Sequence, residues 1–364
     1  MKTKRRVLSI LLALVLLTAM LSGCAKKADG GTSPDPEVTS PSPSPAVTSP
    51  SPEVTSSSPE PVSPSPEPPH YPVTISTFNY ELNPVEFTFE KAPERVVTFW
   101  TGPMETMLAL GLSDKIICAV GVSRDRILPE LQDEFDKIAA GAEYRDFVDS
   151  NAAMSKEYAI MLEADFIYGW KSTFSEKTIG DVDYWHENGI GTYMSLNSND
   201  VSPVRTVANE YEDILTMGRI FDVEERAQEI VDNIKAEVDR VTAATANAEK
   251  KTVLVIEFLG GGITCYNNTY LAGNMVLDMG GLLLDTPNKL GDEDLLIHNP
   301  DVIFLIGSKE GLVEEFVANP AYGSLTSVQN GDVYNLPLSD VYNSGVRTIT
   351  GLNRIGAALY PDLY

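Results

Sequence analysis

The stretch DVEERAQEIVDNIKAEVDRVTAATANAE, from Asp222 to Glu249, predicts one long helix. Its apolar residues recur at steps of three and four, which places them on one stripe of an α-helix. Asp222 followed by Glu225 fits a capping box at the start. A helix of about 25 residues would be about 38 Å long at ~1.5 Å per residue, which suits a rigid strut. The stripe consists of Val223, Ala227, Ile230, Ile234, Val238 and Val241.

The segments on both sides of this stretch alternate strand-like and helix-like patterns, which is typical of α/β domains. We therefore expect two Rossmann-like α/β lobes, residues 73–221 and 250–364, joined by the single long helix at 222–249. Because open α/β sheets bind ligands beyond the carboxyl ends of their strands, we expect a ligand cleft between the lobes.

Residues 1–23 have the pattern of a signal peptide, with a basic start and an apolar core. The residues Leu21-Ser22-Gly23-Cys24 resemble a bacterial lipobox. The resemblance implies cleavage before Cys24 and lipidation of that cysteine, which would anchor the protein to the outer face of the cell membrane. A plain signal peptide and a single membrane helix are the alternatives.

Residues 24–72 are expected to form a tether after the lipid anchor. The part from residue 25 to residue 72 contains 14 of the 24 prolines, mostly in Ser-Pro and Glu-Pro repeats. Such a composition cannot bury a core and favours extended polyproline II. We interpret it as a spacer that holds the folded module away from the membrane.

The charge balance argues against one class of partner. The chain has 27 basic and 52 acidic residues, and removal of the leader leaves 23 basic residues and a net charge of −29. A phosphate backbone would be repelled, so nucleic-acid binding is not expected.

The sequence gives little indication of a metal centre or a disulfide. Cys118 and Cys265 fall in different predicted lobes and are expected to be small buried residues, not a disulfide. No CxxC motif or paired-histidine spacing is present, so neither a metal centre nor a resident cofactor is predicted.

The first lobe begins with a predicted hairpin, Val73–Phe78 and Val85–Phe89. A strand at Arg95–Phe99, a helix from Gly102 to Gly111 and a second strand at Lys115–Val120 then form a βαβ unit. This order implies a parallel sheet.

Several motifs, taken in order, resemble one protein family, the class III periplasmic binding proteins. Members serve importers of ferric siderophores, haem and vitamin B12. The resemblance extends from Ala92 to Tyr364 and implies two α/β lobes joined by one backbone helix. The motifs are Pro93–Val97, Ala109–Leu112, Ser155–Trp170, Asn274–Gly281, Asn299–Ile303, Val328–Tyr334 and Leu359–Pro361.

The resemblance also implies a role and partners. We expect a monomeric, lipid-anchored binding protein that captures an iron–siderophore complex and delivers it to the permease and ATPase of an ABC importer. A corrinoid such as vitamin B12, or haem, is the alternative ligand. Outside this class, a surface sensor or adhesion lipoprotein and an extracellular hydrolase are the alternative functions.

Candidate ligand-binding residues lie on loops at the predicted strand ends. Aromatic faces suit large flat ligands, and guanidinium groups suit anionic oxygens. Trp170 matches a pocket aromatic of vitamin B12-binding members, and Arg347 resembles a family position often held by arginine. The candidates are Trp100, Thr101, Arg124, Tyr144, Arg145, Trp170, Tyr266, Tyr342 and Arg347, with Arg126 and Lys171 on the same loops.

Two carboxylates are candidates for docking on the permease. Family members use one carboxylate in each lobe. Glu157 matches the first position, and Asp278, in VLDMGG, matches the second, where the family usually has glutamate.

An enzyme is not expected. The sequence has no Gly-x-Ser-x-Gly motif, and Gly260-Gly261-Gly262 lacks the lysine of a P-loop. His186 and His298 are interpreted as surface or structural residues. A glycosidase-like pair of carboxylates stays open at this level.

Overall fold

The computed structural model describes residues 70–141, 146–148, 154–198 and 200–364. These residues belong to one compact unit that starts at Pro66. The predicted leader, the lipidation site Cys24, most of the tether, and Tyr144 and Arg145 lie outside the described residues. Nowhere in the described residues does a helix combine the length and the apolarity needed to span a membrane.

The N-terminal lobe is built on a parallel sheet with the strand order β5-β4-β3-β6-β7. The four-residue strand β3 is fully buried, as expected for a central parallel strand covered on both faces. The predicted hairpin is confirmed as an antiparallel pair, β1 (Val73–Phe78) and β2 (Pro84–Phe89). The sheet strands are β3 (Val96–Phe99), β4 (Ile116–Val120), β5 (Asp146–Val148), β6 (Phe166–Gly169) and β7 (Gly191–Met194).

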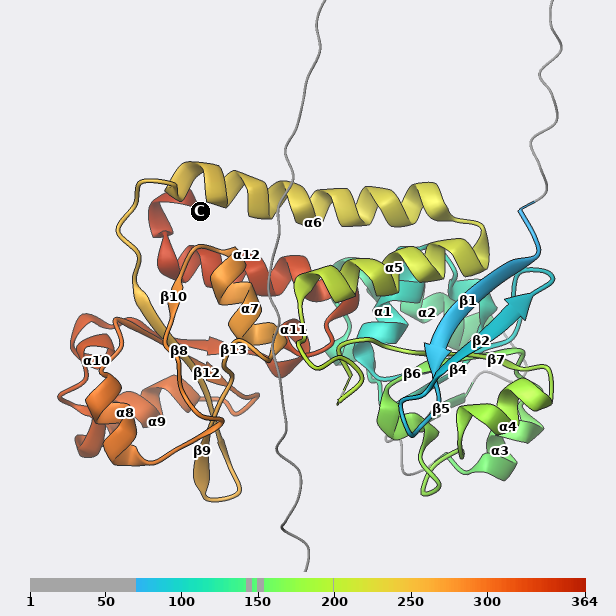
Figure 1. Cartoon of the computed structure of the whole chain (residues 1–364), viewed down its shortest axis with the longest axis horizontal. Coiled ribbons are helices and arrows are strands. Elements are labelled where there is room, and N and C mark those ends of the chain that lie inside the picture. The colour runs from blue at the N-terminus through green and yellow to red at the C-terminus, as the bar shows by residue number, and fades with distance from the viewer. Residues whose placement is uncertain (1–69, 142–145, 149–153, 199) are drawn as a thin grey trace, which may run out of the picture. The chain divides into compact units, whose positions relative to one another are not determined.

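Helices cover both faces of this sheet (Figure 1). The predicted βαβ unit is confirmed, because α1 lies between the parallel strands β3 and β4. The helices are α1 (Thr101–Ala109), α2 (Gln132–Gly141), α3 (Lys156–Met161), α4 (Val182–Glu187) and α5 (Val207–Phe221), with the short 3-10 helices η1 (Ser113–Lys115), η2 (Arg124–Arg126), η3 (Pro129–Leu131) and η5 (Lys171–Phe174).

The C-terminal lobe contains a mixed sheet with the order β11-β9-β8-β12-β13, and β10 pairs with β8. Residues 252–265 form two antiparallel strands, β8 and β9, joined by a turn. Gly260 and Gly261 have φ angles of 65° and 80°, which glycine adopts without steric cost. The strands are β8 (Thr252–Leu259), β9 (Gly262–Cys265), β10 (Leu282–Leu283), β11 (Lys289–Leu290), β12 (Val302–Ile306) and β13 (Val333–Leu336).

Short helices surround this second sheet. Cys265 is buried in β9 and Cys118 in β4, and no disulfide joins them, as expected. The helices are α7 (Leu271–Asp278), α8 (Asp292–His298), α9 (Leu312–Ala318), η6 (Pro320–Tyr322), α10 (Thr326–Asn330), α11 (Leu338–Val341), η7 (Gly345–Arg347), α12 (Thr348–Leu359) and η8 (Pro361–Leu363).

The predicted long helix exists as α6 (Glu224–Thr245), but its start is corrected. Asp222 has φ 57° and ends α5 in the left-handed conformation, so the predicted capping box is wrong. Gly218 lets α5 and α6 pack closely, since a Cβ at that position would lie 2.6 Å from the Ala227 Cβ. The predicted stripe is confirmed, because all its members are buried or half-buried.

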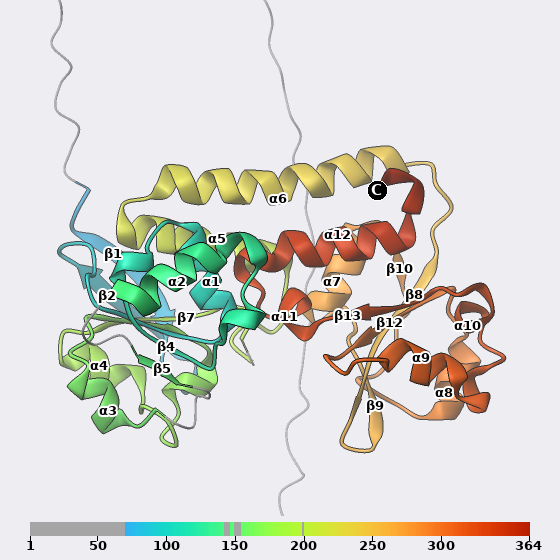
Figure 2. The same ribbon diagram turned by 180° about the vertical axis from the view of Figure 1, so that it is seen from behind.

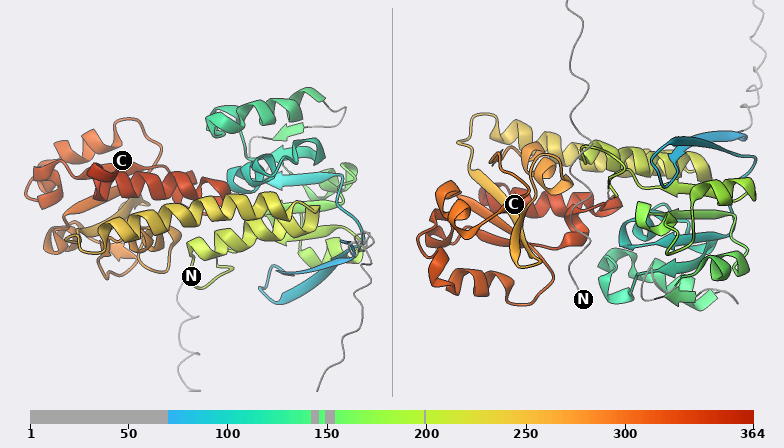
Figure 3. Two further views of the ribbon diagram at one scale, coloured as in Figure 1. Left: turned by 90° about the horizontal axis from the view of Figure 1, so that it is seen from above. Right: turned by 60° about the horizontal axis from the view of Figure 1, so that its bottom comes forward.

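The helix α6 spans both lobes (Figures 1 and 2). At ~1.5 Å per residue its 22 residues extend for about 33 Å. Figure 3 shows α6 running beside α5 over the N-terminal lobe and beside α12 over the C-terminal lobe. One hydrophobic core continues through these three helices into both sheets.

A second contact between the lobes adds to the predicted single joining helix. The loop before α12 returns to the N-terminal lobe, where η7 packs against α1. Gly102 in α1 has no room for a side chain, because a Cβ there would lie 2.3 Å from the Asn343 carbonyl oxygen. The lobes are therefore held by both α6 and the segment 341–347.

A buried carboxyl group fixes this second connection. Glu210 of α5 accepts hydrogen bonds from the backbone nitrogens of Ser344 (3.0 Å) and Gly345 (2.6 Å) and from Asn197 Nδ2 (2.7 Å). Burial raises the pKa of Glu210 to about 7, although the three N–H donors oppose this shift. The pKa of its neighbour Asp213 is also raised by burial.

We expect stability to fall as Glu210 ionises. A raised pKa in the folded state means that this contribution is fully present below about pH 4.5 and is lost as the pH rises through about 7. At ~1.4 kcal/mol per pKa unit the loss is roughly 3 kcal/mol. Urea denaturation at about pH 5 and about pH 8 measures it.

The Glu210→Gln variant should show a smaller loss of unfolding free energy between the two pH values. Glu225→Gln removes an exposed carboxylate near the start of α6 and serves as the control, with the wild-type pH dependence. Equal pH dependence in Glu210→Gln and wild type would contradict the assignment.

Candidate ligand-binding site

Trp100 follows β3 in a conformation that only glycine adopts readily. Its φ of 72° and ψ of 163° are held by a hydrogen bond from its backbone nitrogen to the Val120 oxygen (2.8 Å). The indole covers Gly121, where a Cβ would lie 3.1 Å from the Trp100 ring. Strained residues of this kind persist only when their surroundings fix them, and they cluster at functional sites.

Trp170 stacks on Trp100. Trp170 follows β6, the strand that pairs with β3, so both indoles leave the same edge of the sheet. Their ring centroids are 4.9 Å apart and the ring planes differ by 24°. The indole Nε1 atoms of both residues are buried and find no acceptor among the described residues.

Tyr342, from the C-terminal part of the chain, contacts this pair of indoles. It follows α11, and its ring centroid lies 5.5 Å from that of Trp170 at an angle of 58°. The predicted residues Trp100, Trp170 and Tyr342 are therefore adjacent, although almost 250 positions separate the first from the last.

Arg205 extends the cluster and was not predicted. Its guanidinium carbon lies 5.4 Å from the Tyr342 ring centroid and 4.8 Å from that of Tyr270. The Arg205 side chain is only 12% exposed, and its Nη2 lies 3.7 Å from an Asp200 carboxylate oxygen. The residue sits on the loop between β7 and α5, several residues past the strand, so a search limited to strand ends misses it.

The backbone of Arg205 is fixed by the other lobe. Its nitrogen donates to the Thr269 oxygen (3.2 Å), and Asn274 Nδ2 donates to its carbonyl oxygen (2.9 Å). The guanidinium is therefore positioned by contacts on both sides of the cleft.

Tyr266 ends the series inside the C-terminal lobe. Its ring centroid lies 5.0 Å from that of Tyr270, and its hydroxyl donates to Glu257 (2.7 Å). Burial and this carboxylate raise the pKa of Tyr266. We refer to the whole series as the aromatic ladder: Trp100, Trp170, Tyr342, Arg205, Tyr270 and Tyr266.

The other predicted binding residues of the N-terminal lobe lie outside this series of rings. Arg124 forms a two-pronged pair with Asp136 (2.6 and 2.7 Å) and is half-exposed, as an ordinary surface ion pair is. Lys171 lies 5.3 Å from the Tyr80 ring centroid. Thr101 is the half-buried first residue of α1, directly after Trp100.

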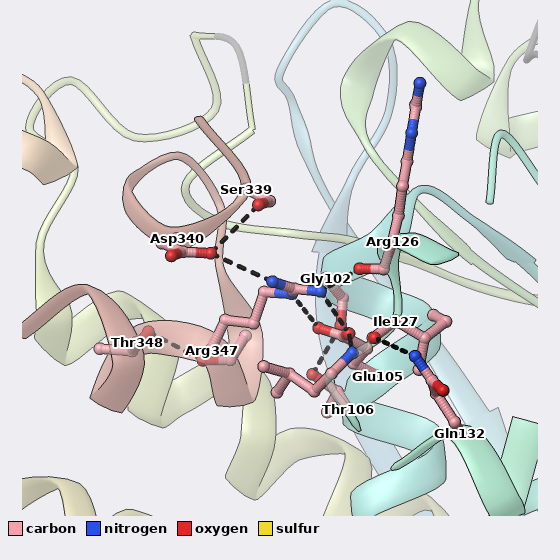
Figure 4. A network of polar contacts seen from close by, with 12 residues as sticks. Gly102, Glu105, Thr106, Arg126, Ile127, Gln132, Ser339, Asp340, Arg347 and Thr348 are labelled. Carbon is pink, nitrogen blue, oxygen red and sulfur yellow. Dashed lines mark hydrogen bonds and ion pairs between the residues drawn. The ribbon is translucent and has the colours of Figure 1, made fainter. Parts of the chain in front are cut away.

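The structure corrects the prediction for Arg347. Its guanidinium donates to Glu105 (2.5 and 2.8 Å) and to Asp340 (3.1 Å), as Figure 4 shows. It also donates to the Arg126 carbonyl oxygen. The side chain is 10% exposed and its donors face protein acceptors, so Arg347 braces α1 against the second lobe instead of facing a ligand.

The structure also separates the two predicted docking carboxylates. Glu157 is exposed in the first turn of α3, on the side of the lobes opposite α6 (Figure 1). Asp278 ends α7, which lies close to α6 and packs against α12. Burial raises the pKa of Asp278. A single docking face is therefore not formed by this pair.

A structural repeat identifies the counterpart of Glu157. Glu157 precedes Asp165 by eight residues, and Asp165 accepts hydrogen bonds from the backbone just before β3. Glu293 likewise precedes Asp301 by eight residues, and Asp301 accepts from the backbone nitrogen of Thr252 at the start of β8. Glu293 lies in the first turn of α8, on the same side as α3 (Figures 1 and 2).

The surroundings of Glu293 favour it over the neighbouring acids. The Asp292 carboxylate accepts from the Tyr322 hydroxyl (2.7 Å), and the Asp294 carboxylate accepts from the Gly291 nitrogen (2.8 Å). Glu293 is exposed and makes no hydrogen bond or ion pair within the described residues. The spacing from Glu293 to Asp301 was visible in the sequence, but its meaning depends on matching the two lobes.

Two lobes around parallel strands, a helix that spans both and a series of aromatic rings that meets between the lobes define a two-lobed solute-binding protein of the class III type. The model of the periplasmic binding protein family matches residues 188–339. A periplasmic binding protein from Veillonella parvula DSM 2008 is 30% identical, covers 80% of this chain and 93% of its own, and superposes with a TM-score of 0.72. The chain belongs to the periplasmic binding protein family.

Two further relatives bear on function. A structure described as an ABC-type Fe3+-hydroxamate transport system, from Saccharomonospora viridis DSM 43017, is 25% identical over 79% of this chain and 99% of its own, with a TM-score of 0.62. An uncharacterised ABC transporter substrate-binding lipoprotein of Bacillus subtilis (strain 168), YvrC, is 24% identical over 97% of this chain and 96% of its own length. The family is one of transport proteins that bind substrates, which agrees with the expectation of a non-enzymatic role.

Replacing Arg347 should destabilise the fold. Arg347→Met leaves Glu105 buried without its partner, and breaking such a pair costs about 3–5 kcal/mol. Arg124→Met removes an exposed, solvent-screened pair, should change stability little and is the matched control. Chemical denaturation of both variants measures the difference, and an Arg347→Met protein as stable as the control would show that the brace is unimportant.

Proposed function

We propose that this protein is the lipid-anchored binding component of an ABC importer and that it captures a ferric siderophore between its lobes. The observation that carries the proposal is the aromatic ladder, which runs from the carboxyl ends of β3 and β6 in one lobe to Tyr270 and Tyr266 in the other. Its place agrees with the rule that open α/β sheets bind ligands beyond the carboxyl ends of their strands.

The chemistry of the aromatic ladder suits a bulky chelate with anionic oxygens. Indole and phenol rings offer broad apolar faces, and guanidinium donates charge-assisted hydrogen bonds to oxygen anions. Trp170 and Tyr342 are in contact, so a ligand that enters between the lobes must part these rings. The indole nitrogens of Trp100 and Trp170, which have no partner among the described residues, would then become donors to the ligand.

Ferric hydroxamates are the ligand class that we favour. The Saccharomonospora viridis relative is described as part of an Fe3+-hydroxamate system, which supports this choice. Haem is disfavoured because no described histidine belongs to the aromatic ladder: His70 lies beside Arg219, His186 beside Thr192, and His298 in α8. A corrinoid fits the same aromatic walls and is the alternative ligand.

Binding is expected to leave the lobes nearly in place. The helix α6, the Arg347 brace and the Glu210 contacts all resist a change in their relative position. We therefore propose that the ligand enters between the lobes when the side chains of the ring residues rotate.

We propose that Glu157 and Glu293 contact arginines of the permease. Both carboxylates lie in the first turns of short helices on the side opposite α6. Hydrogen bonds from its own backbone nitrogen and from Ser155 lower the pKa of Glu157, so it stays charged. Asp278 is not retained as a docking residue.

The anchor completes the proposal. YvrC is described as a lipoprotein, which supports lipidation of Cys24 and a place on the outer face of the membrane. The permease and its ATPase would be the partners.

The test of function is a binding panel of ferric hydroxamates, ferric catecholates, cobalamins and haem, measured by native mass spectrometry and by tryptophan fluorescence. We expect a ferric hydroxamate to bind. Trp170→Ala and Arg205→Ala should each weaken its affinity about tenfold or more, equivalent to ~1.4 kcal/mol.

The control is Arg124→Ala, which removes a cation outside the aromatic ladder and should bind as wild type does. Melting temperatures without ligand separate a loss of contact from a loss of fold. Binding of only haem or cobalamin would refute the siderophore assignment, and unchanged affinity in Trp170→Ala would refute the site.

Charge reversal should separate delivery from capture. The double variant Glu157→Lys/Glu293→Lys should lose uptake of the ferric complex while keeping its affinity, because each substitution places a lysine against an arginine of the permease and like charges repel. Asp278→Asn is the control and should transport normally. Normal uptake by the double variant would remove the docking assignment.

A further inference from the structure

Three ligand-type side chains meet where the chain enters the N-terminal lobe. His70 precedes β1, Asp222 lies in the turn between α5 and α6, and Glu224 is the first residue of α6. The His70 Nδ1 atom lies 3.3 Å from a carboxylate oxygen of Asp222 and 3.3 Å from one of Glu224. The three ligand atoms lie within 4.8 Å of one another, and this is the one such grouping found among the described residues.

The imidazole of His70 is held from its other side. Its Nε2 lies 2.7 Å from the Arg219 carbonyl oxygen. A carbonyl oxygen only accepts, so Nε2 carries a proton and donates it. The ring also packs edge-on against Tyr71 (4.6 Å, 81°), whose hydroxyl donates to the Ile220 oxygen (2.8 Å). Metal-binding histidines are oriented in this way, with the second nitrogen bonded to a carbonyl or carboxylate.

With Nε2 protonated, the neutral ring presents a lone pair on Nδ1 to two carboxylates. Three acceptors facing one another repel unless a cation lies between them. That cation is either a second proton on His70 or a metal ion.

The spacing is compatible with a metal ion. Ligands at ~2.0–2.1 Å in a tetrahedron are separated by about 3.3 Å, and both nitrogen–oxygen separations have that value. One imidazole nitrogen with two carboxylate oxygens suits Zn2+ and similar first-row ions, whereas Mg2+ and Ca2+ prefer oxygen ligands alone. Water would complete the coordination.

The local backbone positions the ligands and leaves access. The left-handed conformation of Asp222 reverses the chain between α5 and α6, which brings Asp222 and Glu224 to one side of His70. Residues 222–226 and Glu229 line a surface hollow, so an ion reaches the group from solvent. Arg226 pairs with Glu229 (2.5 Å) and donates to the Ala109 oxygen (3.1 Å), so its charge is engaged elsewhere.

We propose that His70, Asp222 and Glu224 bind a divalent first-row transition metal ion, Zn2+ being the best match, which fastens the start of the folded module to the turn at the head of α6. The site is separate from the aromatic ladder. Its role is to secure the point at which the chain leaves the predicted tether.

The probe is Zn2+ alone, titrated calorimetrically into the full chain after treatment with a chelator. We expect one site and a rise in melting temperature on binding. His70→Ala and Asp222→Asn should each weaken Zn2+ binding by about tenfold or more, the scale on which changes at metal sites act. Co2+ should give the visible absorption of a low-coordinate site containing histidine.

Control variants separate binding at this site from non-specific binding of Zn2+ to the acidic surface. Glu225→Gln removes a neighbouring carboxylate and His298→Ala removes another histidine, and both should bind Zn2+ as wild type does. Trp170→Ala should also leave Zn2+ binding unchanged, whatever it does to capture of a chelate. Unchanged Zn2+ affinity in His70→Ala, or no Zn2+ binding together with a doubly protonated His70 in nitrogen NMR spectra, would overturn the proposal in favour of an ion pair. If a variant is less stable, the Co2+ spectrum still reports whether the metal is coordinated, because it does not depend on the melting temperature.

Discussion

The buried pair between Arg347 and Glu105 is the interaction on which the cleft depends. It joins residues 242 positions apart, one from each side of the cleft, and Asp340 shares the same guanidinium. Burying these charges is costly unless every group is paired, so an arrangement of the lobes that separated them would be destabilised. The Glu210 carboxyl acts in the same region by binding the backbone of Ser344 and Gly345.

This constraint explains why rings from the two lobes are held in contact in the aromatic ladder. Tyr342 precedes Arg347 by five residues, and Trp100 precedes α1, which carries Glu105. Rings on both sides are thus attached to the same rigid junction. The unfavourable backbone conformation of Trp100, with its positive φ angle, persists because the residues around it are fixed. A site built in this way presents its rings to a ligand without a large motion of the lobes.

The two lobes also repeat one local design. In each, a glutamate in the first turn of a short helix precedes by eight residues an aspartate that binds the backbone ahead of the first central strand. The repeat relates Glu157 to Glu293, and it shows why matching by motif alone selected Asp278. Asp278 belongs to α7, which follows the first strands of its lobe as α1 does in the other.

The sequence by itself determined the elements: the stripe of α6, the βαβ unit of the first lobe, the hairpin, and the aromatic residues Trp100, Trp170 and Tyr342. These follow from local periodicity and from the rule that loops after strands reach one edge. Tertiary structure alone decided that Asp222 ends α5, that Arg347 is a brace, that Arg205 joins the aromatic ladder and that Glu293 matches Glu157. The physical reason is that the role of a charged side chain depends on its partners, and those partners come from distant parts of the chain that only folding brings together.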